Sequence, residues 1–266
     1  MKYIIDHDYH IHSHLSLCSR DPEQTNENIL KYAKSHGLTS IVLTDHYWDS
    51  AIPGASNWYA QQNFDHIAKA LPLPQDEEVK FLFGCECDMN ASRTLGMPLS
   101  RFDDFDFVVI PTTHLHMNGF TVSKEGNETP EERADLWVKR LEALLSMPLP
   151  FHKVGIAHPA CTLIDTKSTD DYLKTLSLIK STDMHDLFSC AAKLGCGIEL
   201  NASDIEQVIK YPAIVTRMFN IAKDAGCKFY LGTDSHLPIE FDGVTELFLS
   251  IIDILGLTED DKFRLR

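Results

Sequence analysis

The chain has 266 residues, 44% of them hydrophobic, and a formal net charge of −15 at pH 7. A surface this acidic repels phosphate backbones, so nucleic acid is not an expected partner. The seven cysteines are scattered without a C-x-x-C pair, which argues against a disulfide framework and for a reducing compartment. We find neither a signal peptide nor an apolar run of the ~18 residues that a membrane span needs. We therefore expect a cytoplasmic protein with no membrane partner.

Short apolar runs alternate with segments of helical periodicity along almost the whole chain. The run at residues 3–5 leads into the first of about seven predicted strands, which ends within residues 8–14. The later strands are predicted at residues 39–44, 79–83, 107–110, 154–157, 196–200 and 227–232. Helices are predicted after Thr25, after Thr129, over residues 184–194, before Gly226 and over residues 244–255.

A glycine stands between a predicted helix and the next strand at three places, Gly37, Gly195 and Gly226. Glycine commonly ends helices, because it adopts the left-handed backbone conformation without a steric penalty. A repeated helix–glycine–strand join is typical of parallel βα units. With no linker long enough to mark a boundary, the pattern predicts a single-domain α/β protein built as a β/α barrel.

Residues that commonly bind metal ions occur where the predicted strands end. His10 and His12 lie two apart on a strand, so their imidazoles point to the same face and suit one metal ion. In a parallel barrel all these strand ends meet at one face, where active sites are found. A set of imidazoles and carboxylates suits two or three ions such as Zn, Mn or Fe. The other candidates at predicted strand ends are His46, Glu86, His114, His158, Asp234 and His236.

Several spaced motifs together resemble one known family. In chain order they are D-x-H-x-H-S from Asp8, T-D-H at His46, G-x-E at Glu86, T-H at His114, A-H-P at His158 and G-T-D-S-H from Gly232. This series is similar to that of the polymerase and histidinol phosphatase (PHP) family, and it covers nearly the whole chain. The resemblance implies a distorted (βα)7, TIM-like barrel, with residues 1–266 forming one metal-dependent phosphoesterase domain.

The resemblance also implies a ligand set for up to three divalent ions. A first ion would be held by His10, His12, Glu86 and Asp234. Glu86 would bridge to a second ion held by His114 and His158, and the third ion would be held by His46 and His236. The catalytic residues implied are Glu86, Asp234 and His236.

One position departs from the family pattern. The family often has Asp or His as a ligand of the third ion shortly after H-x-H, and Cys18 stands there in this chain. A thiolate binds zinc well and would favour zinc at this site. Alternatively, Cys18 is a small apolar side chain and the third site is weak.

These observations predict hydrolysis of a small phosphate monoester by a hydroxide that bridges two metal ions. The expected partner is a small phosphorylated metabolite, with histidinol phosphate as the first candidate and a nucleotide as the alternative. An amidohydrolase-type barrel also opens with H-x-H, but it requires a bridging lysine, and no lysine closes a predicted strand. An inactive metal-binding module is the remaining alternative.

Four polar residues outside the ligand set have predicted roles: Asp8 and Asp45 lie next to predicted ligands, and Glu199 and Asn201 lie at the end of a predicted strand. Asp8 and Asp45 are predicted to orient a neighbouring imidazole. Glu199 and Asn201 are predicted to form hydrogen bonds at the end of their strand.

Overall fold

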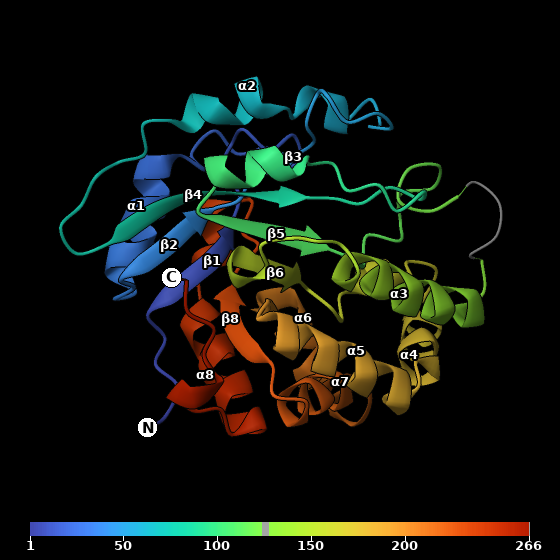
Figure 1. The fold of residues 1–266 in the computed structure, drawn as a ribbon. Coiled ribbons are helices and arrows are strands. Elements are labelled where there is room, and N and C mark those ends of the chain that lie inside the picture. Colours follow the sequence, from blue (N-terminus) through green and yellow to red (C-terminus); the bar gives the residue numbers. More distant parts are fainter. Residues whose placement is uncertain (124–127, 266) are drawn as a thin grey trace.

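Eight parallel strands form one sheet in the computed structural model, which describes residues 1–123 and 128–265 (Figure 1). Seven of the strands pair in chain order as β1-β2-β4-β5-β6-β7-β8, while the two-residue β3 pairs only with β4. The strands are β1 (His7–Ile11), β2 (Ser40–Leu43), β3 (His46–Tyr47), β4 (Lys80–Cys87), β5 (Phe107–Pro111), β6 (Val154–Ala157), β7 (Gly197–Asn201) and β8 (Lys228–Gly232).

The last strand returns to the first. The amide of Asp234 donates a hydrogen bond to the carbonyl of His10 (2.7 Å), and the amide of His12 donates to the carbonyl of Ser235 (3.0 Å). A parallel bridge joins Ile11 to Ser235. The seven strands therefore form a nearly closed, TIM-like barrel, which confirms the predicted fold class.

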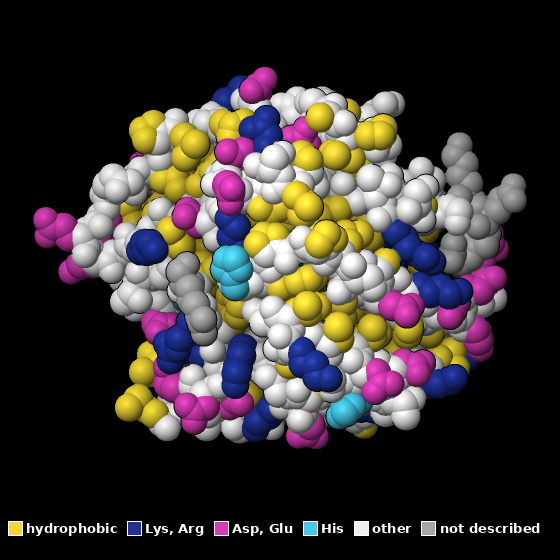
Figure 2. Space-filling model, viewed as in Figure 1, with side chains coloured by type: hydrophobic (Ala, Val, Ile, Leu, Met, Phe, Trp, Pro, Cys, Tyr) yellow, Lys and Arg dark blue, Asp and Glu magenta, His cyan; other side chains and the backbone are white. Residues whose placement is uncertain are grey.

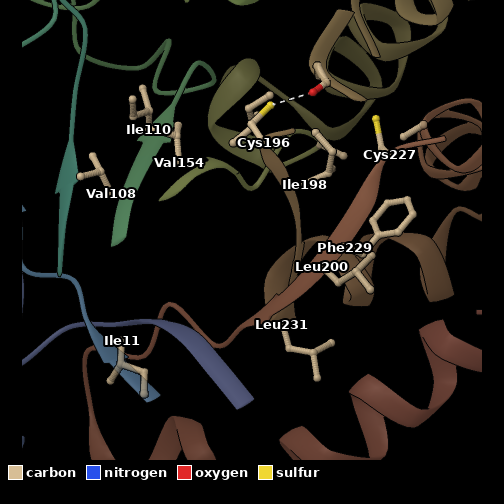
Figure 3. Close-up of a cluster of buried hydrophobic side chains, with 14 of the residues drawn as sticks. Ile11, Val108, Ile110, Val154, Cys196, Ile198, Leu200, Cys227, Phe229 and Leu231 are labelled. Carbon is tan, nitrogen blue, oxygen red and sulfur yellow. Dashed lines mark hydrogen bonds between the residues drawn. The ribbon is translucent and has the colours of Figure 1, made fainter. Parts of the chain in front are cut away.

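Alternate residues of the strands fill the barrel interior. Val42, Val109 and Tyr230 belong to one compact buried cluster, whereas their neighbours along each strand belong to the larger cluster outside it. This alternation follows from the two-residue period of a strand. A Cβ at Gly155 would lie 2.6 Å from the Tyr230 ring, so the interior has room for this ring because residue 155 is glycine. Figure 3 shows part of the larger apolar cluster, with residues from β1, β5, β6, β7 and β8.

Helices form the outer layer and pack against one another around the barrel. Helix α3 contacts α4 and α5, α5 contacts α7, and α6 contacts both α7 and α8. Helix α3 begins after Thr129, as predicted, with a capping box formed by Thr129 and Glu132, and Gly195 ends α5 in the left-handed conformation (φ 81°). The helices are α1 (Asn26–Ser35), α2 (Phe64–Ile67), α3 (Pro130–Leu145), α4 (Thr169–Leu178), α5 (Ser181–Leu194), α6 (Ala202–Lys210), α7 (Pro212–Asp224) and α8 (Val244–Leu255).

The segment before Gly226 holds two helices, α6 and α7, rather than the one predicted. Tyr211 adopts φ −132° and ψ 58°, outside the helical region, and Pro212 begins the new helix. A proline disfavours the helical conformation of the residue before it, which explains the break.

The distribution of surface charge is relevant to nucleic-acid binding, and the length and apolar character of the helices are relevant to membrane insertion. In Figure 2, lysine and arginine side chains are interspersed with aspartate and glutamate over the visible face, with no continuous basic patch. Among the described residues, none of the helices combines the length and the apolar character needed to cross a membrane.

The buried Asp204 of α6 provides a test of pH-dependent stability. Its Oδ2 accepts a hydrogen bond from the amide of Ala160 (3.0 Å), Oδ1 has no partner, and burial raises the pKa of Asp204 to about 7. Since this value exceeds that of an unfolded aspartate (~3.9), folding becomes less favourable as pH rises between these two values. We expect Asp204→Asn to stabilise the protein more at pH 8 than at pH 5, by about 2 kcal/mol. Urea titrations at both pH values measure this difference, and an equal effect at both would contradict it.

Candidate metal centre

Eight of the nine predicted ligands lie at the carboxyl ends of the barrel strands. This placement brings together residues from one end of the chain to the other, as expected for parallel strands. Cys18 instead lies in the loop between β1 and α1. The eight are His10 within β1 and His12 after it, His46 in β3, Glu86 in β4, His114 after β5, His158 after β6, and Asp234 and His236 after β8.

One carboxylate of the centre continues an inward-facing row of a barrel strand, and the other follows the end of such a strand. Leu82 of β4 belongs to the interior cluster, and Glu86 lies four residues further along the same strand. Tyr230 of β8 belongs to the same cluster, and Asp234 follows it by four residues. Residues separated by an even number share a face of a strand, so Glu86 continues the inward-facing row of β4, whereas Asp234 lies beyond the end of β8.

The backbone is irregular where several ligands lie. The pairing of β1 with β2 shifts its register between Asp8 and Ile11, which includes His10. His158 and Asp234 adopt positive φ angles of 26° and 55°. Such conformations are costly for residues other than glycine and are concentrated at functional sites.

The predicted ligands form three groups whose ligand atoms lie within 4.8 Å of one another. The separations and the mixture of nitrogen and oxygen atoms fit divalent ions of the zinc type. The groups are His10 with His12 and Asp234, Glu86 with His114 and His158, and His12 with His46 and His236.

The first group is tightly arranged around Asp234. Its Oδ1 lies 3.1 Å from His12 Nε2 and 3.4 Å from His10 Nε2, and the two Nε2 atoms are 3.1 Å apart. The second group converges on Glu86 Oε1, which lies 3.2 Å from His158 Nε2 and 3.8 Å from His114 Nε2.

The other oxygen of Glu86 faces the first and third groups. Glu86 Oε2 lies 3.4 Å from His12 Nε2 and 2.8 Å from His46 Nδ1. Glu86 Oε2 and His46 Nδ1 are both buried, and neither atom has a hydrogen-bond partner. Two buried polar atoms without a hydrogen-bond partner, next to other ligand atoms, fit neighbouring ligands of one cation. Glu86 thus contacts members of all three groups, and its role as a bridge between ions stays a prediction.

The third group differs in composition from the predicted one. His46 and His236 do lie together, at a ring-centroid distance of 6.0 Å, and the His12 ring packs against both, tilted to His46 (4.5 Å) and stacked on His236 (4.2 Å). Cys18 lines a cavity next to His46 and His236 but belongs to none of the ligand groups formed by the described residues. Cys18 is exposed at the surface, and its partial desolvation together with the nearby Glu86 carboxylate raises the pKa of its thiol. Its role as a ligand therefore stays a prediction.

Buried carboxylates orient two of the imidazoles from behind. His10 Nδ1 lies 2.7 Å from Glu199 Oε1, and the other Glu199 oxygen accepts a hydrogen bond from the amide of His158 (2.6 Å). His114 Nδ1 lies 2.7 Å from Asp88 Oδ2, which also accepts a hydrogen bond from the Tyr59 hydroxyl (2.8 Å). An imidazole that donates its Nδ1–H to a carboxylate keeps its Nε2 lone pair available for a metal ion.

Hydroxyl groups orient two more imidazoles. Ser16 Oγ lies 2.9 Å from His12 Nδ1 and donates to Asp45 (2.6 Å), so Asp45 acts on an imidazole through Ser16. Thr113 Oγ1 lies 2.9 Å from His158 Nδ1.

The predicted role of Asp8 is not seen in its hydrogen bonds, whereas that of Asn201 is. Asp8 contacts no imidazole by the hydrogen bonds described, and instead accepts from the Tyr32 hydroxyl and from the amides of Thr233 and His10. Asn201 forms the predicted strand-end hydrogen bond, accepting from the amide of Ser203 (2.9 Å).

The sequence prediction missed Asp88, Ser16 and Thr113. Asp88 lies two residues after Glu86, so the same-face spacing that singled out His10 and His12 also marks it. No comparable spacing marks Ser16 or Thr113.

The carboxylates of the centre are ionised. Burial opposes this, but the imidazoles of His46 and His10 hold the pKa of Glu86 well below its usual range. The pKa of Asp234 is likewise far below its usual range, because His10 and His12 outweigh the effect of burial.

The imidazoles of the centre differ widely in pKa. Burial would lower the pKa of His12, but Asp234 and Glu86 raise it to about 9. Burial and the neighbouring His12 lower the pKa of His236 to about 3. A cation that enters the first group therefore displaces protons.

The centre opens into a cavity of about 270 Å³. Apolar and aromatic side chains share its lining with the predicted ligands, and no lysine or arginine is among the described lining residues. The lining residues are Cys18, His46, Trp58, Tyr59, Glu86, His114, His116, Met117, Leu163, Asp234 and His236.

Known proteins resemble the chain in sequence and in fold. A model of the PHP domain family matches residues 8–203. A crystal structure of histidinol phosphate phosphatase from Lactococcus lactis subsp. lactis Il1403, complexed with Zn, L-histidinol and phosphate, is 19% identical with a TM-score of 0.63. The match covers 97% of this chain and 98% of that one. The crystal structure of PsfC from Pseudomonas syringae PB-5123 is 17% identical with a TM-score of 0.41, covering 88% and 77%. No curated protein matches the chain in sequence.

Proposed function

The chain belongs to the PHP domain family, and from this premise we propose that it is a metal-dependent phosphoesterase that hydrolyses a small phosphate monoester. The observation that carries the proposal is the convergence of three ligand groups on one cavity, with Glu86 contacting members of each group. A carboxylate that reaches neighbouring cation sites is typical of hydrolases that use paired ions.

In this proposal, each ligand group would hold one divalent ion. His10, His12 and Asp234 would hold the first ion, and Glu86, with His114 and His158, would hold the second. The third would be held by His46 and His236 with either His12 or Cys18. When bound, such ions activate water for attack and neutralise negative charge on the phosphoryl oxygens.

The protein's own groups prepare this site before a substrate arrives. Glu86 and Asp234 are ionised and therefore supply negatively charged oxygen ligands for divalent cations. Glu199 and Asp88 fix the ring orientations of His10 and His114. His236 has its Nδ1 against the carbonyl of Asp234 (2.8 Å), which leaves Nε2 as its free ring nitrogen. We assign catalytic roles to Glu86, Asp234 and His236 on these grounds.

The proposed domain is the whole chain, residues 1–266, although the family match ends at residue 203. Strand β8 lies beyond the match and pairs with β7, which extends the sheet towards β1. Asp234 and His236 follow β8 and belong to two of the ligand groups. The segment after residue 203 therefore supplies part of the proposed centre.

The first candidate substrate is histidinol phosphate. A structural neighbour whose match covers nearly the whole of both chains is a histidinol phosphate phosphatase complexed with Zn, L-histidinol and phosphate. The cavity of about 270 Å³ accommodates a small ester better than a long polyanion. The formal net charge of −15 further disfavours nucleic acid. A free nucleotide is the alternative.

A hydrolysis assay with defined metal content tests the proposal. The protein is stripped with a chelator, reloaded with Zn or Mn, and assayed with p-nitrophenyl phosphate, L-histidinol phosphate and a nucleoside monophosphate. We expect turnover that requires the added metal and disappears when the chelator is restored. Bound metal without turnover of any of the esters would reject the phosphoesterase and leave an inactive metal-binding module.

A further inference from the structure

The cavity has an apolar wall that the ligand groups do not use. Five lining residues, apart from Cys18, belong to none of these groups: Trp58, Tyr59, His116, Met117 and Leu163. Trp58, Met117 and Leu163 form the apolar wall, Tyr59 supports Trp58, and His116 is an exposed imidazole that is not part of the wall. The only carboxylates among the described lining residues are Glu86 and Asp234, both of which lie in the ligand groups.

The indole of Trp58 is held in place by neighbouring rings. It is half-buried and packs edge-on against Tyr59, at a centroid distance of 4.7 Å, and against His46, at 5.0 Å. Tyr59 in turn packs against Trp48 and Phe120 in a small buried cluster. A supported aromatic side chain of this kind binds a flat ligand with little loss of conformational entropy.

The rest of the wall offers no charged partner. The Tyr59 hydroxyl donates to Asp88 (2.8 Å), so Tyr59 contributes mainly its ring to the cavity. Met117 and Leu163 are half-buried and add apolar surface. A thioether next to aromatic rings makes favourable contacts with them.

We propose that the wall formed by Trp58, Met117 and Leu163 binds the organic part of the phosphate ester, and that this part is a flat, uncharged aromatic group. The inference rests on the proposed function and specifies its substrate class. An ammonium group would lose hydration at this wall without gaining a carboxylate of its own. A second phosphate would meet Glu86 and Asp234 with no lysine or arginine among the described lining residues to balance it.

The imidazole ring of histidinol phosphate meets this description, but its ammonium group finds no acidic partner on the wall. The ring and the amine of this candidate substrate are therefore expected to differ in their contribution to binding. The ring contributes to recognition, whereas the amine does not.

A binding experiment tests the wall independently of hydrolysis. Benzylphosphonate has a carbon–phosphorus bond that a phosphoesterase does not cleave, and tryptophan fluorescence of the Zn-loaded protein reports its binding. Trp48 and Trp137 are buried, so Trp58 is the tryptophan that a ligand in the cavity reaches. We expect benzylphosphonate to quench the fluorescence of the wild type and of Trp137→Phe, and to lose most of this effect in Trp58→Phe.

The affinity of the same probe measures the contribution of the ring. We expect Trp58→Ala to weaken benzylphosphonate binding about tenfold, the size of one lost stacking contact. Calorimetry is suited to this comparison because it does not depend on the tryptophan signal. Methylphosphonate lacks the ring and is expected to bind both proteins equally. Equal weakening of both probes, or of neither, would overturn the inference.

Kinetics then tests the substrate class. We expect benzyl phosphate to exceed butyl phosphate and O-phosphoethanolamine in kcat/KM, and Trp58→Ala to remove this preference. L-histidinol phosphate and its analogue without the amine are expected to be turned over at similar kcat/KM. A preference for the amine of about tenfold or more would show that an ammonium group is recognised.

The inference and the proposed function fail in different ways. Hydrolysis of all esters without any preference for the ring would overturn the inference and leave the phosphoesterase intact. Quenching of Trp58 by benzylphosphonate without hydrolysis of any ester would support the wall and overturn the phosphoesterase.

Discussion

Replacing Glu86 by glutamine is expected to abolish metal-dependent hydrolysis while the protein stays folded. Glutamine has nearly the shape of glutamate but lacks the charge that, in the proposed function, would hold cations at the ligand groups. Both Glu86 oxygens face imidazole nitrogens at 2.8–3.8 Å, so the loss affects every group. We expect kcat/KM to fall about 10³-fold or more, which corresponds to ~4 kcal/mol of transition-state stabilisation.

Metal content and turnover are measured on the same preparation of Glu86→Gln. Asp49→Asn is a matched control, because Asp49 is a buried carboxylate with hydrogen bonds to Tyr47 and Arg101 and does not line the cavity. The control is expected to keep its metal and its activity. If Glu86→Gln retained wild-type metal content and turnover, the bridging role would be wrong.

Gly232→Ala is expected to damage the centre through Glu199. A Cβ at residue 232 would lie 1.9 Å from Glu199 Oε1 and 2.8 Å from His10 Cβ. The carboxylate would have to leave its hydrogen bonds to His10 Nδ1 and to the amide of His158. Overpacking and the lost charge-assisted hydrogen bonds are together expected to reduce the free energy of unfolding by about 3 kcal/mol. Metal affinity is expected to fall as well, because His10 loses the group that orients it.

A double-mutant cycle separates this mechanism from a general effect on β8. Glu199→Ala removes the atom nearest to the new methyl group and leaves only the contact with His10 Cβ (2.8 Å), so Gly232→Ala is expected to cost less in that background. Denaturant titrations and metal titrations of the two single variants and the double variant provide the comparison. Costs that simply add would show that the damage does not pass through Glu199.

The sequence was sufficient to predict the barrel and the positions of most candidate ligands. Strand β6 was predicted with the bounds observed, and the glycines at residues 195 and 226 do stand between a helix and a strand. Ligands at strand ends come together because parallel strands share one direction, and this needs no knowledge of side-chain contacts. Their roles as ligands and catalytic residues stay predictions.

Features that depend on packing were not predictable in the same way. His12 belongs to two ligand groups because its ring stacks on His236 (4.2 Å), a contact between residues more than 200 positions apart. The orienting role of Glu199 depends on the space left by Gly232 on the neighbouring strand. The apolar wall combines Trp58 and Met117 from separate loops with Leu163 from a short 3₁₀ turn. Such juxtapositions arise from the closed barrel rather than from any local pattern.

Anomalous diffraction from crystals grown with Zn or Mn and soaked in phosphate is the most direct test of the metal centre. We expect one peak among His10, His12 and Asp234 and a second among Glu86, His114 and His158, at ligand distances of ~2.0–2.2 Å. Phosphate is expected beside these ions, within the cavity that Trp58 borders. Loaded crystals with no anomalous peak at either group, or with peaks only elsewhere, would contradict the assignment of this cavity as a metal centre.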